Sequence, residues 1–163
     1  MKLPEGTPAE LIEGELLMSP SPKQRHQVVI GNLYVALRGF VEARGLGRVF
    51  VAPFDVHLPS GDVVQPDVIF VAAANADIVR DWIFGAPDLL VEAVSPESAP
   101  RDRIVKRELY ARNGVRDYWM IDLEGRSVEV VGPDGPIGFH EIDAAVASRV
   151  VAGLSLPVRG LFA

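Results

Sequence analysis

Glu92 lies inside the apolar run LLVEAVSPES (residues 89–98), which predicts a strand in the interior of the protein. A buried carboxylate is costly unless it is paired, hydrogen-bonded or bound to a metal ion. Two explanations remain open at this point. Glu92 binds a metal ion, or it forms a buried ion pair with a lysine or arginine of the helix that follows.

Asp67 is a second acid in a similar setting, because Gln65-Pro66-Asp67 leads directly into the apolar run VIFVA. We expect Asp67 and Glu92 on neighbouring strands, and two carboxylates in one cleft repel each other unless a cation lies between them. A Mg²⁺ ion would relieve this repulsion and keep positions open for water and a phosphate oxygen. The alternative is an aspartate that makes turn hydrogen bonds after the proline.

Lys106 follows Glu92 by fourteen residues, on a helix predicted over residues 100–113. Asp102, Lys106 and Tyr110 are spaced four residues apart and share one face of that helix. A lysine near a metal site would stabilise negative charge on a phosphate or orient the attacking water. The alternative is an ion pair between Lys106 and Asp102 on a solvated helix face.

The elements that must position these residues form an α/β pattern. A strand at 88–95, the helix at 100–113 and a strand at 117–122 make a βαβ unit, so the two strands are expected to be parallel. Hairpins before and after this unit would make the sheet mixed. We therefore predict one domain over residues 1–163, with a central mixed sheet flanked by helices. Before this unit we predict a strand or hairpin at 10–18, a helix at 23–44, hairpin strands at 48–58 and 63–72, and a short helix or loop at 76–85. After it we predict a second hairpin across residues 133–135 and a last strand and turn in the tail.

The composition limits the chemistry. The chain has 163 residues, no cysteine and three histidines, so a metal site would be built mainly from carboxylates, which suits Mg²⁺ or Mn²⁺. The net charge of −6 argues against extensive nucleic-acid contact, although six basic residues in the segment 101–116 can form a local basic face. The sequence has no apolar run of about 18 residues and no apolar signal-peptide centre, so we expect no membrane span and a cytoplasmic protein.

Several motifs in order carry a resemblance to a known family. PDV (66–68), VEAVSPES, DRIVKRELYARNGVRDYWMID and the early ELIEGEL…SPSPKQRHQ resemble the Uma-two family of restriction-endonuclease-like proteins. That family belongs to the broad PD-(D/E)xK nuclease-like superfamily, and the likeness runs from about residue 10 to residue 123. The resemblance implies a restriction-endonuclease-like fold and metal-dependent cleavage of DNA.

The resemblance also implies roles for individual residues. Asp67 and Glu92 correspond to the two motif acids, and Ala93 would offer its backbone carbonyl to the metal ion. Many superfamily members carry a lysine two residues after the second acid, where this chain has Val94, so Lys106 would fill that role from the helix.

His26 and either Glu13 or Glu15 resemble supporting site residues. Periodicity does not choose between the two glutamates, because Gly14 interrupts their strand. We take Glu15 as the candidate.

Three functions compete at this point. The first is a Mg²⁺- or Mn²⁺-dependent endonuclease acting on DNA, expected by analogy to work as a homodimer that cuts two strands with two sites. The second is a non-catalytic binding or assembly module with the nuclease fold, which Val94 and the acidic net charge favour. The third is a hydrolase with a carboxylate pair, such as a glycosidase, but the chain is short for one and shows no aromatic sugar platform.

Overall fold

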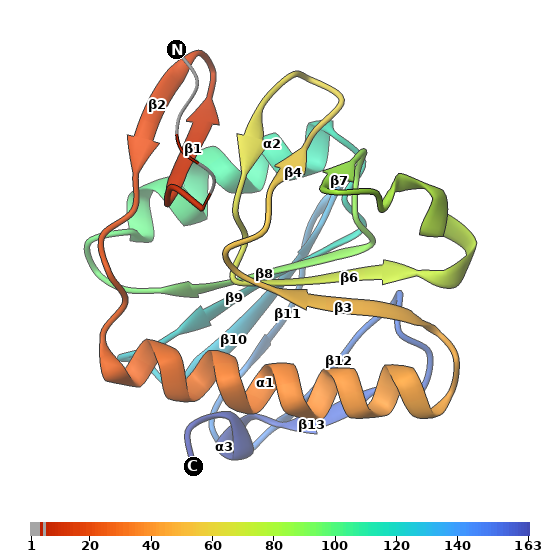
Figure 1. The fold of residues 1–163 in the computed structure, drawn as a ribbon. Helices are drawn as coiled ribbons and strands as arrows, with labels where there is room; N and C mark the ends of the chain where they lie inside the picture. The colour runs from red at the N-terminus through yellow and green to blue at the C-terminus, as the bar shows by residue number, and fades with distance from the viewer. Residues whose placement is uncertain (1–3, 5) are drawn as a thin grey trace.

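A six-stranded sheet forms the centre of the computed structural model, which describes residues 4 and 6–163 (Figure 1). Its strand order is β11-β10-β9-β8-β6-β3. The β8–β9 pair is parallel and the other pairs are antiparallel, so the predicted mixed sheet is confirmed. The strands are β3 (Gly47–Val51), β6 (Val68–Ala72), β8 (Leu89–Val94), β9 (Asp117–Asp122), β10 (Ser127–Gly132) and β11 (Gly135–His140).

The predicted βαβ unit is present, with a difference in its helix. The crossover between β8 and β9 begins as a π-helix, η2 (Arg101–Lys106), and continues as α2 (Arg107–Arg112). The sequence pattern predicts one uniform α-helix over this segment. The π-helical part buries both Asp102 and Lys106, and π-helical turns occur frequently at functional sites.

A second, five-stranded sheet lies beside the central one, in the order β2-β1-β5-β4-β7. Its strands are β1 (Ala9–Ile12), β2 (Glu15–Met18), β4 (Val56–His57), β5 (Val63–Val64) and β7 (Ile83–Phe84). The predicted long hairpin is therefore divided between two sheets, since β3 pairs with β6 and β4 pairs with β5. Pro53 and Pro66 stand at the two breaks, where a proline cannot donate a ladder hydrogen bond.

Side-chain alternation along the central strands divides the core into two parts. Val68 and Phe70 of β6 pack under helix α1 (Gln24–Ala43), whereas Ile69 and Val71 face α2 and the small sheet. Figure 1 shows α1 crossing one face of the central sheet and α2 lying on the other. The buried stripe of α1 contains Val29, Ile30, Leu33, Leu37 and Val41, as its three- and four-residue spacing predicts.

The remaining elements are short. They are η1 (Ala73–Ile78), β12 (Ala145–Ala147), β13 (Ser155–Pro157) and α3 (Val158–Leu161). Two of them, β12 and β13, pair as a separate antiparallel sheet. The end of the chain is fastened to α1, because the Asn32 side-chain amide donates to the backbone oxygens of Leu161 and Ala163.

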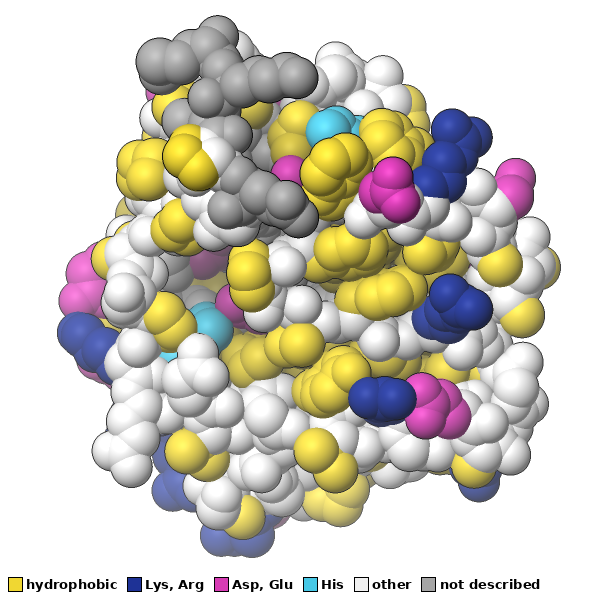
Figure 2. All heavy atoms as spheres, in the orientation of Figure 1, with side chains coloured by type: hydrophobic (Ala, Val, Ile, Leu, Met, Phe, Trp, Pro, Cys, Tyr) yellow, Lys and Arg dark blue, Asp and Glu magenta, His cyan; other side chains and the backbone are white. Residues whose placement is uncertain are grey.

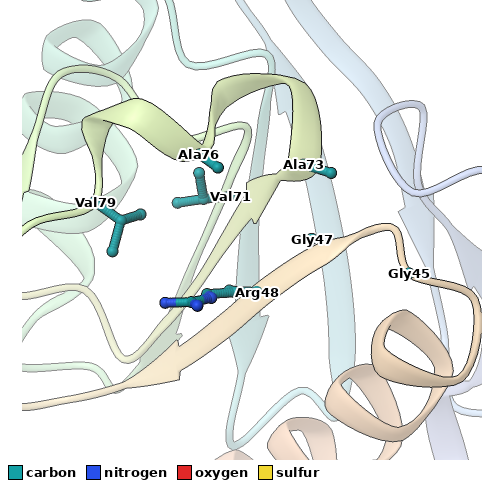
Figure 3. A pocket seen from close by; sticks show the side chains of 7 residues that line it. All are labelled: Gly45, Gly47, Arg48, Val71, Ala73, Ala76 and Val79. Atoms are coloured by element: carbon teal, nitrogen blue, oxygen red, sulfur yellow. The ribbon is translucent and has the colours of Figure 1, made fainter.

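Gly47 fixes the start of β3 at the rim of a hollow of about 210 Å³ (Figure 3). A Cβ atom at this position would lie 2.1 Å from the backbone oxygen of Val71, and its φ of +151° disfavours other residues. We expect Gly47→Ala to lower the free energy of unfolding by about 2 kcal/mol or more, measured by urea denaturation.

Gly39 provides the matched control, because a Cβ atom added there would meet nothing within 4 Å on the exposed face of α1. Gly39→Ala is expected to raise the free energy of unfolding by about 0.5–1 kcal/mol, since alanine favours a helix interior. Equal effects of the two substitutions would contradict this account of Gly47.

Candidate active site

Four acidic side chains meet two basic ones between the central sheet and the small sheet. The acids are Glu10, Asp67, Glu92 and Asp102, here called the carboxylate cluster, and the basic partners are Lys106 and His26.

Strand pairing explains why the two predicted motif acids meet. Val68 pairs with Val91 in the antiparallel β6–β8 ladder, and extending the register by one residue sets Asp67 opposite Glu92. Directly opposite residues of an antiparallel pair project on the same face. Both acids therefore turn toward α2 and the small sheet, on the face of Ile69 and Leu90.

Lys106 lies at the centre of the cluster and is only 4% exposed. Its Nζ atom is 2.7 Å from Glu92 Oε1, 2.9 Å from Glu10 Oε1 and 3.8 Å from Asp102 Oδ1. The alternative of an Asp102–Lys106 pair on a solvated helix face is wrong, because both residues are buried. The alternative of a buried ion pair for Glu92 is present in the structure, and Lys106 provides it.

Burial and charge act in opposite directions on these groups. Loss of solvent raises the pKa of Glu92 well above its usual range; Lys106 opposes this, while the charges of Asp67, Asp102 and Glu10 add to it. Burial by itself lowers the pKa of Lys106, but the carboxylates of Glu92, Glu10 and Asp102 outweigh it and raise that pKa. Lys106 therefore remains an ammonium ion at neutral pH.

Asp67 is held at both oxygens by groups distant in the chain. Its Oδ2 accepts a hydrogen bond from the backbone N–H of Ala93 at 2.8 Å, and its Oδ1 lies 3.0 Å from His26 Nε2. Burial lowers the pKa of His26, but the hydrogen bond and charge of Asp67, with the charge of Asp102, raise it overall. The structure thus brings His26 and Ala93 to Asp67, in place of the local turn hydrogen bonds that the alternative predicted.

Glu10 belongs to the cluster, although the sequence reasoning did not select it. The structure does not bring Glu15 into the cluster, because it lies exposed on β2; Glu13 sits in the turn and pairs with Arg112 at 2.9 Å. Glu10 is 2% exposed, and its Oε1 also accepts the backbone N–H of Gln65. The alternation of side chains along a strand could have indicated this position, because Glu10 shares the inward face of β1 with Ile12.

The charges of the cluster do not balance within the part of the chain described. Four carboxylates face one lysine and one histidine, so even a protonated His26 leaves two negative charges when all four acids are ionised. One divalent cation would supply the missing charge.

The donor set for such an ion is small. Among residues 4 and 6–163, no group of three or more His, Cys, Asp or Glu side chains is arranged to hold a metal ion. Asp67, Glu92 and the Ala93 carbonyl offer two carboxylates and one backbone oxygen. This set fits Mg²⁺, which commonly uses one or two carboxylates and keeps waters and substrate phosphates as its other ligands.

The cluster lies beneath an accessible part of the surface. Figure 2 shows a hollow between the β1–β2 hairpin and α1, with acidic and histidine side chains visible in it. Asp67 and His26 retain 15% and 20% side-chain exposure, whereas Glu92 retains 7%. A ligand entering from this side would meet Asp67 and His26 before Lys106.

The family model of Uma2, described as "Putative restriction endonuclease", matches residues 1–159. This chain belongs to the Uma2 family. The match includes all members of the carboxylate cluster, together with Lys106 and His26.

A solved structure supports the fold of this Uma2 chain. The crystal structure of "a putative nuclease belonging to DUF820" from Anabaena variabilis is 23% identical to it, with a TM-score of 0.82. The superposition covers 98% of this chain and 93% of that one, so the restriction-endonuclease-like fold predicted from the motifs is confirmed.

Curated relatives of the Uma2 chain match over a shorter length. "Probable quinol oxidase subunit 2" of Staphylococcus aureus strains USA300 and N315 is 23% identical over 112 residues. The match covers 69% of this chain but 30% of that protein, so this chain spans only part of the length of these relatives. Within the described residues of the Uma2 chain, no helix has both the length and the apolar character needed to cross a membrane.

Proposed function

We propose that this Uma2 protein is a Mg²⁺- or Mn²⁺-dependent endonuclease that hydrolyses phosphodiester bonds in DNA. The observation that carries the proposal is the excess of carboxylates over basic groups at one partly accessible site. Asp67, Glu92 and the Ala93 carbonyl would hold the ion. A homodimer would present one such site to each strand of a duplex.

The bound ion would supply Lewis-acid polarisation of a phosphoryl oxygen and a lower pKa for a coordinated water. The chain's own residues have separate tasks. The Ala93 N–H fixes the orientation of Asp67, and Lys106 holds Glu92 in place. The ammonium of Lys106 adds positive potential where a phosphodiester gains negative charge during hydrolysis. His26 holds the exposed side of Asp67 and is a candidate to move a proton at the mouth of the site.

A non-catalytic binding or assembly module is the second candidate. Its support is the position of Lys106, whose ammonium lies between Glu92 and Glu10 at ion-pair distance and is 5% exposed at the side chain. Val94 at the usual lysine position agrees with it. Calorimetric titration with Mn²⁺ separates the candidates, because the module predicts no binding at millimolar metal.

Conversion of supercoiled plasmid DNA to nicked circles in the presence of Mn²⁺ tests the proposed activity. We expect Asp67→Asn to reduce the cleavage rate by a factor on the order of 10²–10³, since one charged ligand is lost from the site. Asp81→Asn removes an exposed aspartate and should cleave at the wild-type rate. Cleavage that persists in excess EDTA, or equal rates for Asp67→Asn and wild type, would refute the assignment.

A further inference from the structure

The two oxygens of Glu92 have different surroundings. Oε1 accepts hydrogen bonds from Lys106 Nζ at 2.7 Å and from the Tyr110 hydroxyl at 3.0 Å. Among the hydrogen bonds of the described residues, none reaches Oε2. We infer that Tyr110 is a positioning residue, which fixes the rotation of the Glu92 carboxylate so that Oε2 is the oxygen offered to a divalent metal ion. This inference rests on the proposed function.

The Tyr110 ring is itself held rigidly. It is 1% exposed and packs edge-on against Tyr118, with the ring centroids 4.9 Å apart and an interplanar angle of 83°. This contact is made by the ring of Tyr118 and not by its hydroxyl. The hydroxyl of Tyr110 can therefore direct Glu92 from a fixed position.

Lys106 alone would not fix the carboxylate in the same way. Its ammonium is shared between Glu92 and Glu10 and sits on a flexible four-carbon stem. The Tyr110 hydroxyl has no other acceptor among the described residues than Glu92. A neutral donor also orients the carboxylate without adding a second positive charge beside the ion.

The hydroxyl of Tyr110 suits this task, because a phenol carries its proton at neutral pH and donates it to the carboxylate. Groups that orient a metal ligand typically change metal affinity by 10- to 100-fold when they are removed.

The test is calorimetric titration of the whole protein with Mn²⁺ alone, for wild type, Tyr110→Phe and Tyr118→Phe. Tyr110→Phe should weaken Mn²⁺ binding by about 10-fold or more, because Glu92 is free to rotate. Tyr118→Phe is the matched control, since it removes a buried hydroxyl that donates to Asp102 and not to Glu92. It should bind Mn²⁺ within about twofold of wild type, while both variants lose a similar 2–4 °C or so in melting temperature.

The possible outcomes distinguish this inference from the proposed function. If wild type binds Mn²⁺ and Tyr110→Phe binds it equally well, Tyr110 has no positioning role and the metal site stands. The same conclusion follows if Tyr118→Phe weakens binding as much as Tyr110→Phe does. If wild type binds no Mn²⁺ at millimolar concentration, both the inference and the proposed function fail.

Discussion

Glu92→Gln is expected to lower Mn²⁺-dependent DNA cleavage by a factor on the order of 10²–10³, while the protein remains folded. Glutamine keeps the size of the side chain but removes the negative charge that the metal ion requires. It can still accept hydrogen bonds from Lys106 and Tyr110 at its amide oxygen. Plasmid nicking measures the rate, and circular dichroism measures the fold.

The same substitution should change the pH dependence of stability. The pKa of Glu92 is raised in the folded state above its ordinary value of 4.5. When the pH rises above 4.5, the unfolded chain therefore loses the proton of Glu92 while the folded wild type still keeps it. The free energy of unfolding of the wild type therefore decreases as the pH rises from 4.5 through the raised pKa of folded Glu92. Glu92→Gln should remove this decrease, because glutamine does not titrate.

Glu97→Gln is the control for the cleavage measurement, because Glu97 is exposed and lies 3.6 Å from Lys23 at the surface. It should nick plasmid DNA at the wild-type rate. Nicking by Glu92→Gln as fast as by wild type would remove Glu92 from the mechanism.

Lys106→Met is expected to lower the free energy of unfolding by about 3–5 kcal/mol at neutral pH. Methionine fills similar space but removes the cation that Glu92 and Glu10 share in the interior. The two buried carboxylates then lose their charged partner, so the free-energy cost of removing them from water is no longer offset by an ion pair. Denaturation by urea, followed by circular dichroism, measures the loss.

The control for this substitution is Lys23→Met, since the Lys23 side chain is 86% exposed. Its effect on the free energy of unfolding should stay within about 0.5 kcal/mol. A loss below about 1 kcal/mol for Lys106→Met would show that the carboxylates do not depend on Lys106 for their burial.

Much of the central sheet, and several residues of the candidate site, could be selected from the sequence. Glu92 stands out because it interrupts a continuous apolar strand, and Asp67 because it follows a proline at the start of another. The βαβ order fixes β8 and β9 as parallel neighbours, and this places the Lys106 helix over the strand that carries Glu92.

The features that could not be predicted depend on contacts between distant segments. The inward turn of Glu10 depends on the pairing of β1 with β5, more than fifty residues away. Nothing in the local pattern of residues 101–106 distinguishes a π-helix from an α-helix, and the acceptor of the Tyr110 hydroxyl appears only in the folded chain. Pro53 and Pro66 mark where the two long strands break, but the pairing of the separated pieces with β1 and β7 appears only in the folded chain.

A crystal grown with MnCl₂ and measured at the manganese absorption edge tests the central claim most directly. We expect one anomalous peak in contact with both Asp67 and Glu92, on the side of Glu92 away from Lys106 and Tyr110. Absence of a peak there at millimolar Mn²⁺, or a peak bound by neither carboxylate, would contradict it.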